Sequence, residues 1–211
     1  MPDFALPDSV PATLEVGAGT AGPITLPTAG LGAVASIGLP AEARAAVLHN
    51  VFRQFAAAPD VQFVGIGGAA LDPMAPRLAA RVDPAESMLV AHRLLGQVAD
   101  ELFRRNGSGD AAPLVVLLVD DAGTLLDGYR AAANQAGTLA RIGGSKGVAS
   151  VWVTSADRLP ECLADAAAGH HGPDIAGLPT PEDTAALAEA TAGLTRPVRG
   201  VTLGTGARHS W

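Results

Sequence analysis

The sequence contains one lysine, Lys146, among its 14 lysine and arginine residues, and one cysteine, Cys162. A single cysteine excludes an intramolecular disulfide and cannot by itself build a zinc site. Aromatic residues are also scarce, at 4% of the chain, so alanine, valine and leucine must form most of the core. The fold therefore has to rest on the packing of aliphatic side chains rather than on covalent or metal cross-links.

Long hydrophobic runs and basic clusters are missing as well. No apolar stretch reaches membrane-spanning length, and the N-terminus lacks a basic segment followed by an apolar core, so we expect a soluble, cytoplasmic protein without membrane contact. The formal net charge is -7 and the pI about 5.1, and the nearest approaches to basic patches are Arg104-Arg105 and the turn with Arg141 and Lys146. Direct binding to nucleic acid is therefore expected to be weak or absent.

The sequence does contain an alternation of strand-like and helix-like segments. Of the 211 residues, 48% are hydrophobic and 17% are charged, which is typical of one globular domain. Strands are predicted at residues 31–37, 61–66, 113–119, 148–154 and 199–203, and helices at 40–57, 83–106, 159–168 and 181–192, with further helical potential up to 141. Residues 67–82 are predicted as an irregular connection. The alternation predicts an α/β layered fold with a mostly parallel sheet.

The first segment that suggests chemistry is the turn after the strand at 31–37. A phosphate-binding loop reads G-x-x-x-x-G-K-[ST]. Its backbone N–H groups hold phosphates, its lysine neutralises them, and its hydroxyl ligates Mg²⁺. Here Gly38 is kept, but the last three positions are Ala43, Arg44 and Ala45. Arg44 keeps a positive charge with a different geometry, and Ala45 supplies no metal ligand.

Two more residues of this turn disfavour a bound polyphosphate. Pro40 removes one N–H donor, and Glu42 places a carboxylate beside the position that a polyphosphate would take. Like charges ~4 Å apart repel by roughly 1 kcal/mol in water and by more near a protein surface. The residues alone therefore favour an ordinary strand-to-helix turn, with proline at the first helical position, over a nucleotide site.

The apolar strand at 113–119 ends in Asp120-Asp121, which is the arrangement of a Walker B motif. In such a motif the first carboxylate holds Mg²⁺ through water and the second polarises the attacking water, although Asp121 is one methylene shorter than the usual glutamate. Thr154, at the end of the strand at 148–154, stands where motor folds sense the γ-phosphate. The alternatives are a buried strand that ends in a solvated acidic turn, and a hydroxyl residue that caps the next helix.

Taken in order, these segments resemble the FtsK/SpoIIIE-type DNA-translocase and secretion ATPase family over roughly residues 20–205. The resemblance is carried by Gly22-Pro23-Ile24, Val34-Ala35-Ser36-Ile37-Gly38, Val61–Ile66, Leu71-Asp72-Pro73, residues 115–121, Leu139-Ala140-Arg141-Ile142-Gly143, Gly147-Val148, Pro181-Glu182-Asp183-Thr184 and Pro197-Val198-Arg199-Gly200. It implies a RecA-like P-loop NTPase core of three layers, ring-shaped oligomers, and DNA or protein as cargo. The core would span 31–205, with 1–30 as N-terminal edge strands or an arm and 206–211 as a C-terminal tail.

The resemblance also assigns roles to single residues. It implies ATP with Mg²⁺ as the cofactor, with Gly38, Arg44, Ala45 and Thr154 at cofactor-binding positions. Asp120 would ligate Mg²⁺ if a nucleotide binds, and Asp120 and Asp121 would be catalytic if the site is active. The substitutions at 43–45, and Asp121 in place of glutamate, argue against hydrolysis and against tight ATP binding. The first expectation is therefore that no cofactor is bound.

Three functions stay open at this point. The leading one is a catalytically silent RecA-like domain, a pseudo-ATPase that acts as an interaction or regulatory partner in a DNA-transfer or secretion apparatus. Its protein partner would be an active motor of the same family, a second copy or a client. The alternative is a weak or active Mg-ATPase coupled to DNA or protein translocation, with Arg44 in place of the lysine. The second alternative is a small-molecule enzyme that uses Asp120 and Asp121 at the carboxyl end of a doubly wound sheet.

Overall fold

The structure, a computed structural model, describes residues 4–19, 22–28, 33–37, 41–105, 113–155, 160–163 and 199–201. Its elements follow in the order β1 (Thr13–Gly19), β2 (Gly22–Pro27), β3 (Ala33–Ile37), α1 (Ala41–Phe55), β4 (Val61–Ile66), the 3-10 helix η1 (Ala69–Arg77), β5 (Leu78–Val82), α2 (Met88–Arg105), β6 (Leu114–Asp120), α3 (Ala122–Leu126), α4 (Arg130–Ile142), the 3-10 helix η2 (Gly144–Lys146), β7 (Val148–Val153) and β8 (Arg199–Val201). The predicted helix at 181–192 and tail at 206–211 lie outside the described residues. None of the described helices is long and apolar enough to cross a membrane.

Six strands form the main sheet, in the order β5-β4-β6-β7-β3-β8. The neighbours from β5 to β3 pair in parallel, and β8 pairs antiparallel with β3. β1 and β2 form a separate two-stranded antiparallel sheet. The α/β fold with a mostly parallel sheet that the sequence predicts is therefore confirmed.

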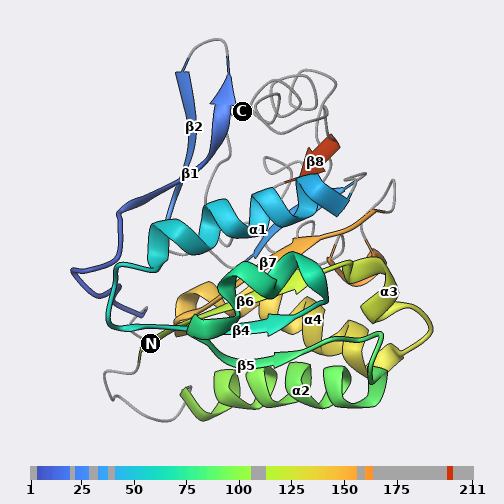
Figure 1. Ribbon diagram of the computed structural model, residues 1–211. Coiled ribbons are helices and arrows are strands. Elements are labelled where there is room, and N and C mark those ends of the chain that lie inside the picture. The colour runs from blue at the N-terminus through green and yellow to red at the C-terminus, as the bar shows by residue number, and fades with distance from the viewer. Residues whose placement is uncertain are drawn as a thin grey trace.

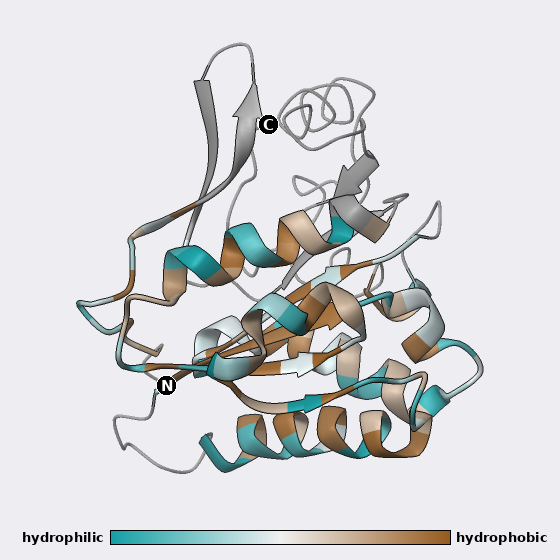
Figure 2. Ribbon diagram, viewed as in Figure 1, coloured by the Kyte–Doolittle hydropathy of each residue, from teal (hydrophilic) through white to brown (hydrophobic). Residues whose placement is uncertain are grey.

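Helices cover both faces of the main sheet, which gives three layers (Figure 1). One face carries α1 and η1, and the other carries α2, α3 and α4. Because both faces of β6 are covered, residues 114–119 are all buried, and this strand is a continuous apolar run. Alternate side chains belong to opposite cores, with Val116 and Leu118 on the α1 side and Leu117 and Val119 on the α2 side. Figure 2 shows these hydrophobic strands between the helices.

The structure corrects the prediction for residues 67–87. The segment at 67–82 is not an irregular connection, because η1 and the strand β5 occupy it. β5 lies at the edge of the sheet and none of its residues is fully buried, so its sequence lacks the apolar alternation that predicts a strand. α2 begins at Met88 rather than at residue 83. The Asp83 carboxylate accepts a hydrogen bond from the Ala85 N–H at 2.8 Å, which forms a turn in place of the first helical residues.

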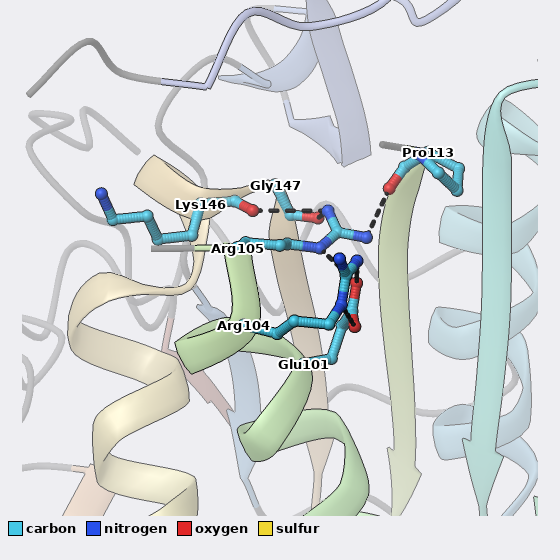
Figure 3. Close-up of polar contacts among 6 residues, drawn as sticks. All are labelled: Glu101, Arg104, Arg105, Pro113, Lys146 and Gly147. Carbon is cyan, nitrogen blue, oxygen red and sulfur yellow. Dashed lines mark hydrogen bonds and ion pairs between the residues drawn. The ribbon is translucent and has the colours of Figure 1, made fainter. Parts of the chain in front are cut away.

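Arg105, in the last turn of α2, forms hydrogen bonds at the amino ends of both β6 and β7 (Figure 3). Its guanidinium donates to the carbonyl oxygens of Gly147 at 2.9 Å and Pro113 at 2.8 Å, and to the Glu101 carboxylate at 2.8 Å. The side chain is only 6% exposed. Arg105 therefore adds little positive charge to the surface beside Arg104, because its planar guanidinium is used inside the protein to satisfy several oxygens at once.

Candidate functional site

The carboxyl ends of β3, β7 and β6 lie side by side at one edge of the main sheet, because these strands are parallel neighbours. The chain leads from β3 into α1 on one face, and from β6 into α3 and α4 on the other. In open α/β sheets such a reversal creates a crevice beyond the strand ends, and ligands bind there. This edge is therefore the place to look for the residues that the sequence singles out.

Arg44 and Asp120 meet at this edge. Arg44 lies in the first turn of α1, and Asp120 is the last residue of β6. Arg44 Nε donates to Asp120 Oδ1 at 2.6 Å, across 76 residues of sequence, and the two side chains are only 15% and 11% exposed. A charge-assisted bond of this length is strong where water is largely excluded, and removing either side chain would cost the other this short ion pair.

Asp121 has an unusual backbone conformation. Its φ of 58° and ψ of 61° place it in the left-handed region, and within the described ranges it is the one residue other than glycine with a positive φ. Aspartate tolerates this region better than most residues do, because its short polar side chain can hydrogen-bond locally. Thr124 Oγ1 donates to Asp121 Oδ2 at 2.8 Å, while Oδ1 accepts longer bonds from Thr154 at 3.3 Å and Ser155 at 3.4 Å.

The two adjacent carboxylates therefore have different surroundings. Asp120 is engaged by a cation from α1, whereas both oxygens of Asp121 accept from hydroxyl groups of α3 and of the segment after β7. Thr154 is buried and belongs to this second group. The structure thus brings Arg44, Asp120, Asp121 and Thr154 to one edge of the sheet.

Gly67 and Arg81 are further residues of this site that sequence reasoning missed. Gly67 follows β4 with a φ of 157°, and a Cβ added there would lie 2.6 Å from the Cβ of Asp120. The Gly67 N–H donates to the Val82 carbonyl at 2.8 Å, and Arg81 Nη2 donates to the Gly68 carbonyl at 2.7 Å. The signal was present in the paired glycines after a strand, which indicate a close approach of backbone to a neighbour even where no dinucleotide motif exists.

The remaining predicted residues offer little for a metal or nucleotide. Ala45 lies partly buried in α1 and has no oxygen to give, and Gly38 falls outside the described residues. Within the part of the chain that the structure describes, no group of three or more His, Cys, Asp or Glu side chains could hold a metal ion. Mg²⁺ in nucleotide sites commonly uses one or two carboxylates together with the phosphates. Asp120 is the one carboxylate at the expected place, and an oxygen of it is bonded to a guanidinium.

The helices on both faces of the parallel sheet and the two carboxylates at the end of β6 define a three-layer α/β domain with a candidate site at the carboxyl ends of its strands. The sequence itself matches no protein-family model and no curated protein. Among solved structures, the conjugation coupling protein TcpA of pCW3, in its monomer form with ATPγS, aligns with a TM-score of 0.59 and 16% identity over 77% of this chain and 55% of that chain.

Two further structures of ATPases have the same fold. The structure of Thermomonospora curvata EccC (ATPases 2 and 3) with a signal sequence peptide aligns with a TM-score of 0.55 and 20% identity over 72% of this chain and 35% of that chain. EssC (ATPases 2 and 3) from Geobacillus thermodenitrificans gives 0.57 and 15% identity over 79% and 38% of the two chains. The chain therefore spans less than two thirds of the length of each of these three. The likeness confirms the predicted RecA-like fold and is consistent with the resemblance to FtsK/SpoIIIE-type domains.

Proposed function

We propose that this chain is a non-hydrolysing domain of the FtsK/SpoIIIE type, which serves as an interaction or regulatory domain in a DNA-transfer or secretion apparatus. The observation that carries the proposal is the ion pair between Arg44 and Asp120. In a hydrolysing site the acidic residue at the end of the strand serves Mg²⁺, and the cation at the start of the helix serves the phosphates. Here the two groups neutralise each other.

Binding of Mg-nucleotide would first have to break this short, largely buried pair. Ala45 offers no hydroxyl group for the metal, and the Asp121 carboxylate, which would have to polarise a water, accepts from three hydroxyl groups of the protein. The nucleotide would therefore gain fewer contacts than in a complete site, while the protein would lose an internal one. This balance of contacts favours a domain that has the fold of a nucleotide hydrolase but does not hydrolyse nucleotide.

The structural neighbours support the proposal that such a domain works in a DNA-transfer or secretion apparatus. One of them is a conjugation coupling protein, and another is a secretion ATPase whose structure contains a signal sequence peptide. A domain with the same fold can keep surfaces for protein partners after its nucleotide chemistry has been lost, because those surfaces and the site are built from different residues. The protein partner would be an active motor, a second copy or a client.

The proposal is tested by titrating a fluorescent ATP analogue into the protein with and without Mg²⁺, and by measuring phosphate release at high protein concentration. We expect no saturable binding at millimolar nucleotide and no release. Asp120→Asn, which removes the negative charge paired with Arg44 while keeping the shape of the side chain, should at most add weak binding that does not need Mg²⁺. Asp100→Asn, on the exposed side of α2, is the matched control and should change nothing.

The alternative is a weak Mg-ATPase, and one observation favours it. Arg44, Asp120 and Thr154 do stand together at the carboxyl edge of the sheet, as they would in a working site. This alternative predicts micromolar, Mg²⁺-dependent binding and phosphate release that Asp120→Asn abolishes. That result would overturn the proposal.

A further inference from the structure

A cleft of about 850 Å³ opens at Asp121, and neither Arg44 nor Asp120 lines it. Its walls come from α3, from the first turns of α4 and from the described residues 155 and 160–162. This volume is in the range of sites that bind small molecules or peptide segments. The cleft lies at the carboxyl edge of the sheet, where folds of this kind place their ligands.

The lining of the cleft combines three apolar side chains with exposed carboxylates. Leu126 is buried, and Ala133 and Pro160 are partly buried, so these three side chains offer an aliphatic surface. Asp127 and Glu161 are exposed at the cleft, and among the described residues neither carboxylate has a hydrogen bond or ion pair. An apolar surface with carboxylates at its border fits a long basic side chain, which lays its aliphatic stem on carbon and directs its charged head to the acids.

The first turns of α4 supply hydrogen-bond donors to the same cleft. Arg130 and Asn134 are spaced four residues apart on this helix, both are exposed, and within the described ranges neither side chain has a polar partner. Residues at this spacing lie on one face of a helix. Backbone carbonyl oxygens of a bound peptide are suitable acceptors for these donors, whereas a polyamine has no acceptor group for them.

We infer that the cleft binds an extended peptide segment of a partner protein through one basic side chain of that segment. The lining includes three carboxylates, those of Asp121, Asp127 and Glu161, against one guanidinium, that of Arg130, and this excess of negative charge disfavours nucleic acid. The inference rests on the proposed function in one respect, since it gives the expected protein partner a place to dock.

The test is a titration of the isotope-labelled protein with an end-capped glycine-serine peptide that carries one central arginine. Binding is followed by the NMR chemical shifts of the backbone amides of the protein. Amides of Gly123, Gly128 and Asn134 should shift and saturate, and a twin peptide with glutamine in place of arginine should produce no saturable shift. Asp127→Asn/Glu161→Gln should weaken binding roughly threefold to tenfold, as expected for the loss of two partly solvated ion pairs.

The matched control is Glu86→Gln/Asp100→Asn, which makes the same change in net charge at exposed residues outside the cleft. It should leave the affinity for the arginine peptide unchanged. Equal weakening by both double variants, shifts confined to other regions, or spermidine producing the same shifts at the same concentration would overturn the inference. Because this readout needs no nucleotide, its failure is distinguishable from a failure of the proposed function, which would show as Mg²⁺-dependent nucleotide binding.

Discussion

Gly67 lies at the end of β4 with its Cα against the side chain of Asp120. A methyl group at this position would meet the Asp120 Cβ at 2.6 Å and the Asp120 backbone nitrogen at 3.3 Å, and the φ of 157° is rare for residues with a side chain. We therefore expect Gly67→Ala to lower the free energy of unfolding by roughly 2–4 kcal/mol, from overpacking and backbone strain together. Urea unfolding measures this loss directly.

Gly128→Ala is the control for Gly67→Ala. Gly128 also has a positive φ, 66°, but an added Cβ would meet no atom within 4 Å. Gly128→Ala should therefore lower the free energy of unfolding only by the cost of the left-handed backbone conformation, roughly 1–2 kcal/mol. Equal losses for the two variants would mean that the close approach to Asp120 is not what requires glycine at position 67.

Single residues of the site could be predicted from the sequence where chemistry and position agree. Asp120 follows the most apolar strand, and Arg44 stands at the lysine position of a phosphate loop, so both were found. Their mutual ion pair was not predicted, because a sequence does not show which side chains meet across 76 residues. Whether Arg44, Asp120 or Thr154 contacts a nucleotide stays a prediction.

At the scale of elements, the carboxyl end of α2 is held to β6 and β7 through charged groups. The hydrogen bond from Arg104, with further contributions from Arg105, lowers the pKa of Glu101 from 4.5 to about 2, while burial opposes the shift. Because the pKa is lower in the folded state, Glu101 stabilises the fold above about pH 4.5, and this contribution is lost as the pH falls toward 2. Since the carboxylate is partly exposed, we expect the contribution to be roughly 1–2 kcal/mol.

Comparison with Glu101→Gln isolates this contribution. The variant should be less stable than the parent at neutral pH, and the difference should shrink toward zero as the pH falls from 4.5 to 2, because the protonated Glu101 then resembles glutamine. Urea unfolding of both proteins across this range measures the difference, and the other carboxylates cancel in it. A difference that stays constant with pH would exclude the ion pairs as its cause.

The elements that could be predicted are those buried on both faces. β4 has the predicted bounds, Val61–Ile66, β6 is shifted by one residue at each end, and β7 ends one residue earlier, because their apolar runs are set by the cores above and below them. β5 was missed because an edge strand is paired on one side and has no such core on both faces. The start of α2 was misplaced because a local turn at Asp83 competes with the helix. Helix-start signals in the sequence do not show which of the two conformations is more stable.

At the scale of the whole molecule, the alternation of elements predicted the fold class but not the strand order. The insertion of β7 between β3 and β6 brings the ends of three distant segments together. This order depends on contacts between strands far apart in the sequence, which hydrophobic periodicity does not encode. The cleft beside Asp121 was not predictable for the same reason, since α4 and residues 160–162 meet only in the folded chain.

The distribution of charge over the whole molecule leads to a last prediction, about DNA. The net charge is -7, and Arg44, Arg81 and Arg105 are directed to carboxylates and carbonyl oxygens of the protein. An acidic chain is expected to neutralise few phosphates of a duplex, and affinity falls with salt by a logarithmic slope of about -0.9 for each phosphate that is neutralised. Fluorescence anisotropy with a labelled duplex should show at most weak binding at low salt and no binding at physiological salt. Binding that persists at physiological salt would contradict this prediction. If the prediction holds, we expect this part of the protein to act through protein contacts, such as those proposed for the cleft beside Asp121, rather than by binding DNA itself.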